Sequence, residues 1–64
     1  MPKVSKEVRE LRKNEILEAA LHCFSSKGYH LTTVDDIVKA CGLSKGAVYH
    51  YFKSKEEIFL SLLQ

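Results

Sequence analysis

The segment LSKGAVYHYFKSK, residues 43–55, gathers side chains that suit contact with a phosphate-bearing surface. Its lysines can neutralise phosphates or donate to guanine O6 and N7, and its tyrosines and histidine can donate hydrogen bonds to phosphate oxygens. Gly46 has no Cβ, so the backbone there can approach another surface closely. These residue types in this order indicate nucleic-acid binding rather than covalent catalysis.

Each of these residues also has a simpler interpretation when it is taken alone. Gly46 can be a tolerated glycine in a helix, Tyr49 a partly buried aromatic residue, and Lys45 and His50 ordinary surface residues. The combination favours DNA binding because it stands at the start of the second of two closely spaced helices. In that motif the second helix enters the major groove with its N-terminal residues towards the bases.

Helical periodicity and capping residues predict the elements that must hold this segment. In the first half of the chain apolar residues recur about every 3.6 positions, and a glycine follows them where a helix end favours one. Thr33 with Asp36 forms a capping-box pattern, and Ser44 and Ser54 can each cap a further helix. The expected elements are a basic arm at 1–8 and helices at about 9–27, 33–41, 44–51 and 54–64.

The second and third helices form the predicted helix-turn-helix, since only Gly42 and Leu43 separate them. At 100° per residue, Val48 and Tyr51 share the inner side of the third helix. Gly46, with Tyr49 and His50, then lies on the opposite, exposed side, and Lys45 lies at its edge. Val48, Phe52, Ile37 and Phe24 are the expected core residues.

Length and composition restrict the class of protein. A chain of 64 residues makes one small domain, and 45% hydrophobic with 28% charged residues is ordinary for a soluble globular protein. Cys23 and Cys41 stand alone at helical positions, so free thiols in a reducing cytoplasm are expected, with no metal site and no cofactor. The pattern contains no nucleophile–base pair and no phosphate-binding glycine loop, so an enzyme is not expected.

The apolar stripe of the fourth helix continues to the end of the chain. Leu62 and Leu63 therefore predict a longer protein, and Leu17 and Leu21 on the first helix could face the same further part. The simpler alternative is that these leucines complete this small core. The rival function that this stripe suggests is a small helical protein-interaction module that docks a partner through the fourth helix.

The sequence TTVDDIVKACGLSKGAVYHYFKSKEEIF, preceded by ILEAALHCFSSKGY, resembles the N-terminal DNA-binding domain of TetR-family bacterial transcription regulators. The resemblance covers roughly residues 16–63. It is specific because three features coincide: the AA…F…KGY helix end, the T…I…A…G helix and the G-x-S-K-G-x-x-Y-x-x-F-x-x-K block. It implies an all-α fold, a small three-helix homeodomain-like bundle with a TetR-type helix-turn-helix, plus the start of a fourth helix.

The resemblance also implies roles for individual residues of the domain at 9–64. Lys45, Gly46 and Ala47 fall near the bases. Phosphate contacts are expected at Thr33, Ser44, Tyr49, His50, Tyr51 and Lys55. Independently of the resemblance, the charge of Lys53 can also neutralise a phosphate. The inward-turned ring of Tyr51 can pack while its hydroxyl reaches outwards. Lys45 is expected to set sequence preference, and Lys55 to strengthen binding to all duplexes alike.

The same resemblance implies properties of a whole protein. Such regulators are dimeric, ligand-responsive repressors whose C-terminal helical domain binds a small-molecule inducer and spaces two DNA-binding domains on a palindromic operator. That ligand-binding and dimerisation domain is expected to be absent from this chain. The basic residues before Ile16 can lie along the DNA backbone or reach the minor groove, although a solvated arm is the favoured interpretation.

Overall fold

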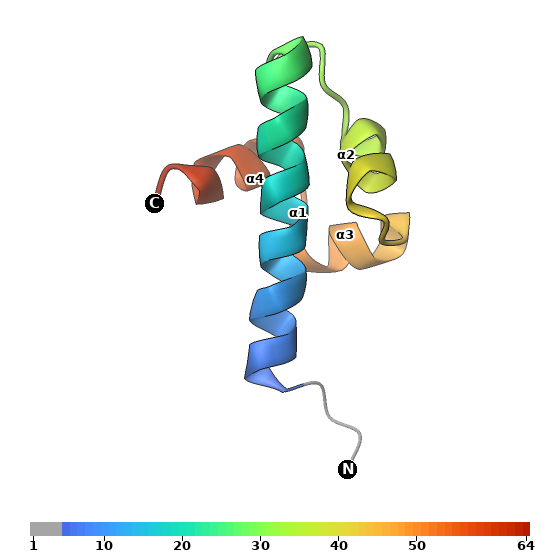
Figure 1. Cartoon of the computed structure of the whole chain (residues 1–64), viewed down its shortest axis with the longest axis vertical. Coiled ribbons are helices and arrows are strands. Elements are labelled where there is room, and N and C mark those ends of the chain that lie inside the picture. The colour runs from blue at the N-terminus through green and yellow to red at the C-terminus, as the bar shows by residue number, and fades with distance from the viewer. Residues whose placement is uncertain (1–4) are drawn as a thin grey trace.

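The computed structural model describes residues 5–64, and within this range the chain forms four α-helices and no strand. Figure 1 shows α1 as the long axis of the domain, with α2 and α3 on one side of it and α4 leading away to the C-terminus. The all-α class expected from the sequence is confirmed. The helices are α1 (Lys6–Lys27), α2 (Val34–Cys41), α3 (Lys45–Tyr51) and α4 (Lys55–Leu62).

The start of α1 differs from the prediction. Ser5 is the N-cap, and its Oγ accepts a hydrogen bond from the Val8 amide at 3.2 Å. Glu7 in the first turn complements the positive end of the helix dipole. The helix therefore begins at Lys6 rather than at residue 9, and residues 6–8 of the expected basic arm are helical. Residues 1–4 of that arm lie outside the described range.

The caps of α2 agree with the sequence pattern. Thr33 Oγ1 accepts from the Asp36 amide at 3.1 Å, and Asp36 Oδ2 accepts from the Thr33 amide at 2.9 Å, which completes the capping box. Lys27 Nζ lies 2.9 Å from the same Oδ2 and ties the end of α1 to the start of α2. Gly42 ends the helix at φ 79°, a left-handed conformation that glycine adopts at no steric cost.

These hydrogen bonds predict a pH dependence of folding. The bond from the Thr33 amide, followed by that from Lys27, lowers the pKa of Asp36 from 3.8 to about 2. A carboxylate with a depressed pKa stabilises the fold above its ordinary pKa, and this contribution is lost as pH falls through the lower value. The free energy of unfolding, measured by urea denaturation, should therefore fall between about pH 4 and pH 2. Asp36→Asn should flatten this change, whereas Glu18→Gln should preserve it.

The last two helices have the predicted N-caps. Ser44 Oγ accepts from the Ala47 amide and Ser54 Oγ from the Glu57 amide, each at 3.1 Å. The Glu57 carboxylate accepts a short hydrogen bond from the Lys53 amide, which fixes the approach to α4. Helix α4 ends at Leu62 rather than at residue 64, because the chain tightens into an i→i+3 bond there, from the Leu63 amide to Leu60 O at 3.1 Å.

The core draws residues from all four helices and from the residue after α3. The predicted core residues Ile37, Val48 and Phe52 are buried, while Phe24 is half-buried and packs on the core from outside. Ile37 is the single fully buried residue of α2. The buried apolar set is Ile16, Ala19, Ala20, Cys23, Ile37, Val48, Phe52 and Ile58.

The leucines of α1 and of the C-terminal end differ in burial. Leu17 and Leu62 are half-buried and pack against the core, so they complete it. Leu21 is 55% exposed and Leu63 is 67% exposed, so they contribute little to this core. The sequence pattern could not distinguish Leu17 from Leu21, or Leu62 from Leu63, because all four occupy apolar positions at helical spacing.

The turn between α1 and α2 has its own buried polar anchor. Thr32 is 1% exposed, and its hydroxyl donates a shared hydrogen bond to Cys23 O at 3.1 Å and Gly28 O at 2.7 Å. Gly28 O also accepts a hydrogen bond from the Thr32 amide at 3.2 Å, so the backbone and the side chain of Thr32 both bind the end of α1. The turn is thus closed by side-chain as well as backbone hydrogen bonds.

Candidate nucleic-acid interface

Helix α3 presents the exposed face that its sequence predicted. Lys45, Gly46, Tyr49 and His50 are exposed, whereas Val48 on the opposite side is completely buried. The buried side fixes the helix on the core, so the exposed side has a defined orientation. A helix held in this way can be inserted into a groove without rearrangement of the domain.

Tyr51 packs inwards, as the helical spacing predicted. Its side chain is half-buried against the core, and its ring lies edge-on to that of His50, with centroids 5.0 Å apart. The ring of His50 is thereby supported from one side. Ala47 is half-buried between this inner surface and the exposed face.

Gly46 has no internal structural reason to be glycine. Its φ is not in the left-handed region, and a Cβ built on its backbone would meet no atom within 4 Å beyond the adjacent residues and the backbone of its own helix. The chain itself would therefore accept alanine at this position, which is a better helix former. The fold therefore does not require glycine at position 46. Either this glycine is merely tolerated, or the surface of another molecule approaches the helix backbone there.

The hydroxyls of Thr33 and Ser44 serve first as helix caps. Each oxygen accepts a bond from the amide three residues ahead, and within residues 5–64 neither hydroxyl donates a hydrogen bond. Since a hydroxyl carries one donor besides its acceptor lone pairs, both can still donate to a phosphate oxygen. Capping and phosphate contact are therefore compatible at both positions.

The two lysines after α3 differ from each other in a way that the sequence did not reveal. Lys53 is exposed, with Nζ 3.4 Å from Tyr49 O. Lys55 is half-buried: its Nζ donates to Tyr29 O at 2.6 Å and to His30 O at 3.5 Å, and it lies 4.1 Å from the centroid of the Tyr29 ring. Lys55 thus fastens α4 to the α1–α2 turn, a contact between residues that are far apart in the sequence.

Lys45 also has a partner that sequence reasoning missed. Its Nζ lies 3.3 Å from Oδ1 of Asp35 in the first turn of α2, and the two side chains are 62% and 63% exposed. As an acidic residue in the first turn of α2, Asp35 also complements the positive end of that helix's dipole. The short turn between α2 and α3 could have indicated this pair, because it brings the first turns of the two helices close together.

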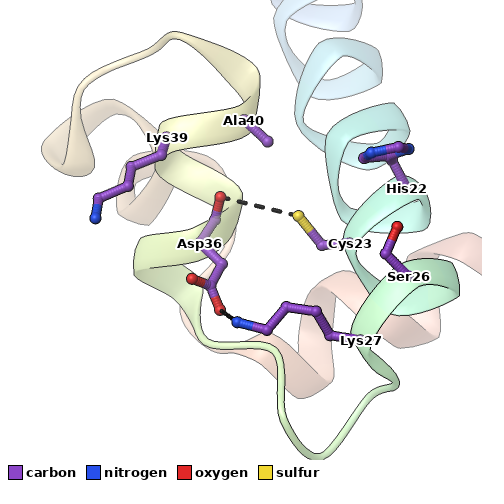
Figure 2. A pocket seen from close by; sticks show the side chains of 7 residues that line it. All are labelled: His22, Cys23, Ser26, Lys27, Asp36, Lys39 and Ala40. Carbon is purple, nitrogen blue, oxygen red and sulfur yellow. Dashed lines mark hydrogen bonds and ion pairs between the residues drawn. The ribbon is translucent and has the colours of Figure 1, made fainter.

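A shallow groove of about 370 Å³ lies between α1 and α2, away from the predicted site residues, none of which lines it. Figure 2 shows the Lys27–Asp36 ion pair across it and the Cys23 thiol pointing at Asp36 O, 3.9 Å away.

Cys23 and Cys41 are both free thiols. The described residues contain no cluster of side chains suited to hold a metal ion. Over residues 5–64, no helix has the length and apolar character needed to cross a membrane.

Comparison with known proteins confirms the family resemblance. Residues 16–62 match the family model described as bacterial regulatory proteins of the tetR family. That match includes α2, α3 and the turn between them, and therefore the whole exposed face of α3.

Curated relatives match almost the whole chain. An uncharacterized HTH-type transcriptional regulator, YfiR of Bacillus subtilis, is 49% identical over 98% of the chain and 31% of the relative. The HTH-type transcriptional repressor Rv1474c of Mycobacterium tuberculosis is 40% identical over 97% of the chain and 33% of the relative. The repressor AcnR of Corynebacterium diphtheriae is 44% identical, with the same two coverages. The chain thus spans about a third of the length of these relatives.

Proposed function

Because the chain belongs to the tetR family of bacterial regulatory proteins, we propose that it is the sequence-specific DNA-binding part of a transcriptional regulator. Helix α3 lies in the major groove. The observation that carries this proposal is the exposed face of α3, where Lys45, Gly46, Tyr49 and His50 stand opposite the buried Val48. Such a face suits insertion between two phosphate backbones.

Base contacts come from the start of α3, and backbone contacts from its surroundings. Lys45 donates to a guanine, and Gly46 and Ala47 allow close approach. The hydroxyls of Thr33 and Ser44 donate to phosphates from the starts of two helices. The remaining phosphate contacts come from Tyr49, His50, the Tyr51 hydroxyl, Lys53 and Lys55. For Lys55 this contact competes with its bond to Tyr29 O.

The whole protein is a dimeric, ligand-responsive repressor that binds a palindromic operator in the cytoplasm and has no enzymatic activity. Two matched relatives carry the name transcriptional repressor, and they are about three times as long as this chain. In this proposal, a further part of the whole protein provides dimerisation and binds a small-molecule inducer. The alternative, a docking module that uses α4, draws its support from Leu60 and Leu63, which are 52% and 67% exposed.

An NMR titration of the chain with a mixed-sequence duplex tests the proposal. Amide shifts should concentrate at Thr33 and at residues 45–50, and they should fade as salt rises, because phosphate contacts release counterions. Shifts confined to residues 58–63, or none at any salt concentration, would favour the docking module instead. The readout therefore separates the two functions on one sample.

Lys45→Ala and Lys53→Ala should weaken binding in different ways. Loss of the base contact of Lys45 should reduce discrimination between duplexes by about 1–3 kcal/mol. Loss of the Lys53 charge should weaken binding to every duplex and reduce the slope of log K against log salt by about 1. Lys53 replaces Lys55 in this test because the Lys55 ammonium also holds the α1–α2 turn.

The comparison requires affinities for several unrelated duplexes, measured by fluorescence anisotropy at two salt concentrations. Circular dichroism of each variant checks that the fold is intact. Equal losses on all duplexes for both variants would contradict this division between base and phosphate contacts.

A further inference from the structure

Asp35 occupies an unusual place on the proposed DNA-binding face. It is the second residue of α2, its side chain is 63% exposed, and its Oδ1 lies 3.3 Å from Nζ of Lys45 at the start of α3. The neighbouring Asp36 makes the capping box and the ion pair to Lys27. The capping of α2 therefore depends on Asp36, and Asp35 is available for another role.

Folding gains little from the Asp35–Lys45 pair. An ion pair with both side chains more than half exposed is well solvated, so its net contribution to stability is small. On a surface that approaches DNA, however, a carboxylate repels phosphates and reduces binding to every duplex. A negative charge beside the base-reading lysine therefore opposes affinity, and its effect must be sought in selectivity.

We propose that Asp35 is a specificity-determining residue that reads DNA jointly with Lys45; the inference rests on the proposed function. An ammonium group carries three donors, so Lys45 can keep its bond to Asp35 while it donates to guanine O6 or N7. The carboxylate has a second oxygen, and a carboxylate accepts well from the N4 amino group of cytosine. The pair thus recognises a guanine together with a cytosine beside it or opposite it.

The same carboxylate rejects other sequences. Where thymine O4 or guanine O6 takes the place of the cytosine amino group, the carboxylate faces another hydrogen-bond acceptor. It then loses its hydrogen bonds to water and gains none from the base, which costs free energy. On a non-cognate duplex Asp35 also withdraws part of the Lys45 charge from the phosphates. Removal of its charge should therefore strengthen indiscriminate binding and weaken sequence preference.

The test compares the unchanged chain with Asp35→Asn, which keeps the side-chain shape and removes the charge. Glu18→Gln is the matched control, since Glu18 is an exposed carboxylate of α1 with no hydrogen bond or ion pair to residues 5–64. Affinity for one non-cognate duplex is measured over a salt series. Selection from a randomised duplex pool at one salt concentration gives the sequence preference. Circular dichroism checks folding, and Asp35→Ser provides a second variant should Asn disturb α2.

Asp35→Asn is expected to bind the non-cognate duplex about threefold to tenfold more tightly, with a salt slope steeper by up to about 0.9. The selected pool should lose its cytosine preference at one position, and Glu18→Gln should change neither result. If Asp35→Asn and Asp35→Ser select the same sequences as the unchanged chain, the inference is overturned while the proposed function stands. If the unchanged chain shows no salt-dependent DNA binding, the proposed function fails first and the inference falls with it.

Discussion

Ile37→Ala is expected to leave most of the chain unfolded at room temperature. Ile37 is 0% exposed and is the only fully buried residue that α2 contributes to the core. Replacing a buried isoleucine by alanine typically costs about 2–5 kcal/mol, because apolar burial is lost and a cavity remains. A single core in a domain of this size rarely supplies more than about 3–5 kcal/mol, so the two quantities are comparable.

Urea denaturation followed by circular dichroism measures this loss. Leu31→Ala is the matched control, because Leu31 is 72% exposed and its truncation should change the free energy of unfolding by less than about 0.5 kcal/mol. A loss below about 1 kcal/mol for Ile37→Ala would show that the site collapses well or that α2 is held mainly by its caps. DNA binding should be lost together with the fold, because α2 and the short turn after it position α3.

Gly46→Ala is expected to change stability and DNA binding in opposite directions. Beyond the adjacent residues and the backbone of α3, no atom lies within 4 Å of the added Cβ, and alanine is a better helix former by up to about 1 kcal/mol. The free energy of unfolding should therefore rise. If α3 enters the major groove, the same methyl group lies between the helix backbone and the DNA. We expect the affinity for DNA to fall at least about tenfold, or about 1.4 kcal/mol.

Gly42→Ala provides the contrast for this prediction. Its added Cβ is also free of contacts, but Gly42 has φ 79°, where an alanine is strained by about 1–2 kcal/mol. The same chemical change should therefore destabilise the fold at Gly42 and stabilise it at Gly46. If Gly46→Ala binds DNA with unchanged affinity, then Gly46 is merely a tolerated glycine in the helix.

The features of the fold that depend on neighbouring residues could be predicted from the sequence. The caps at Thr33, Ser44 and Ser54, the end of α2 before Gly42 and the inner position of Val48 each follow from local chemistry or helical spacing. Each was found where the sequence indicated. The exposed face of α3 was predicted for the same reason, since it is the complement of the buried side.

The features that depend on distant residues could not be predicted. The contact of Lys55 with Tyr29 O joins positions 26 residues apart, and the Lys45–Asp35 pair crosses the turn between two helices. A single sequence carries no signal for which of several lysines folds back onto the chain. The start of α1 was missed for a different reason, because the Ser5 cap lies before the first strongly apolar position.

The closed turn between α1 and α2 has a consequence for the kinetics of association. The Thr32 hydroxyl bonds to carbonyls within the turn, and the Lys55 ammonium of α4 bonds to Tyr29 O. Thr33 and the start of α2 are therefore held in place before DNA binds. A surface that is already ordered loses little conformational freedom on binding. Encounter should then proceed at a rate set by diffusion and charge, and differences between DNA sequences should appear mainly in how long each complex lasts.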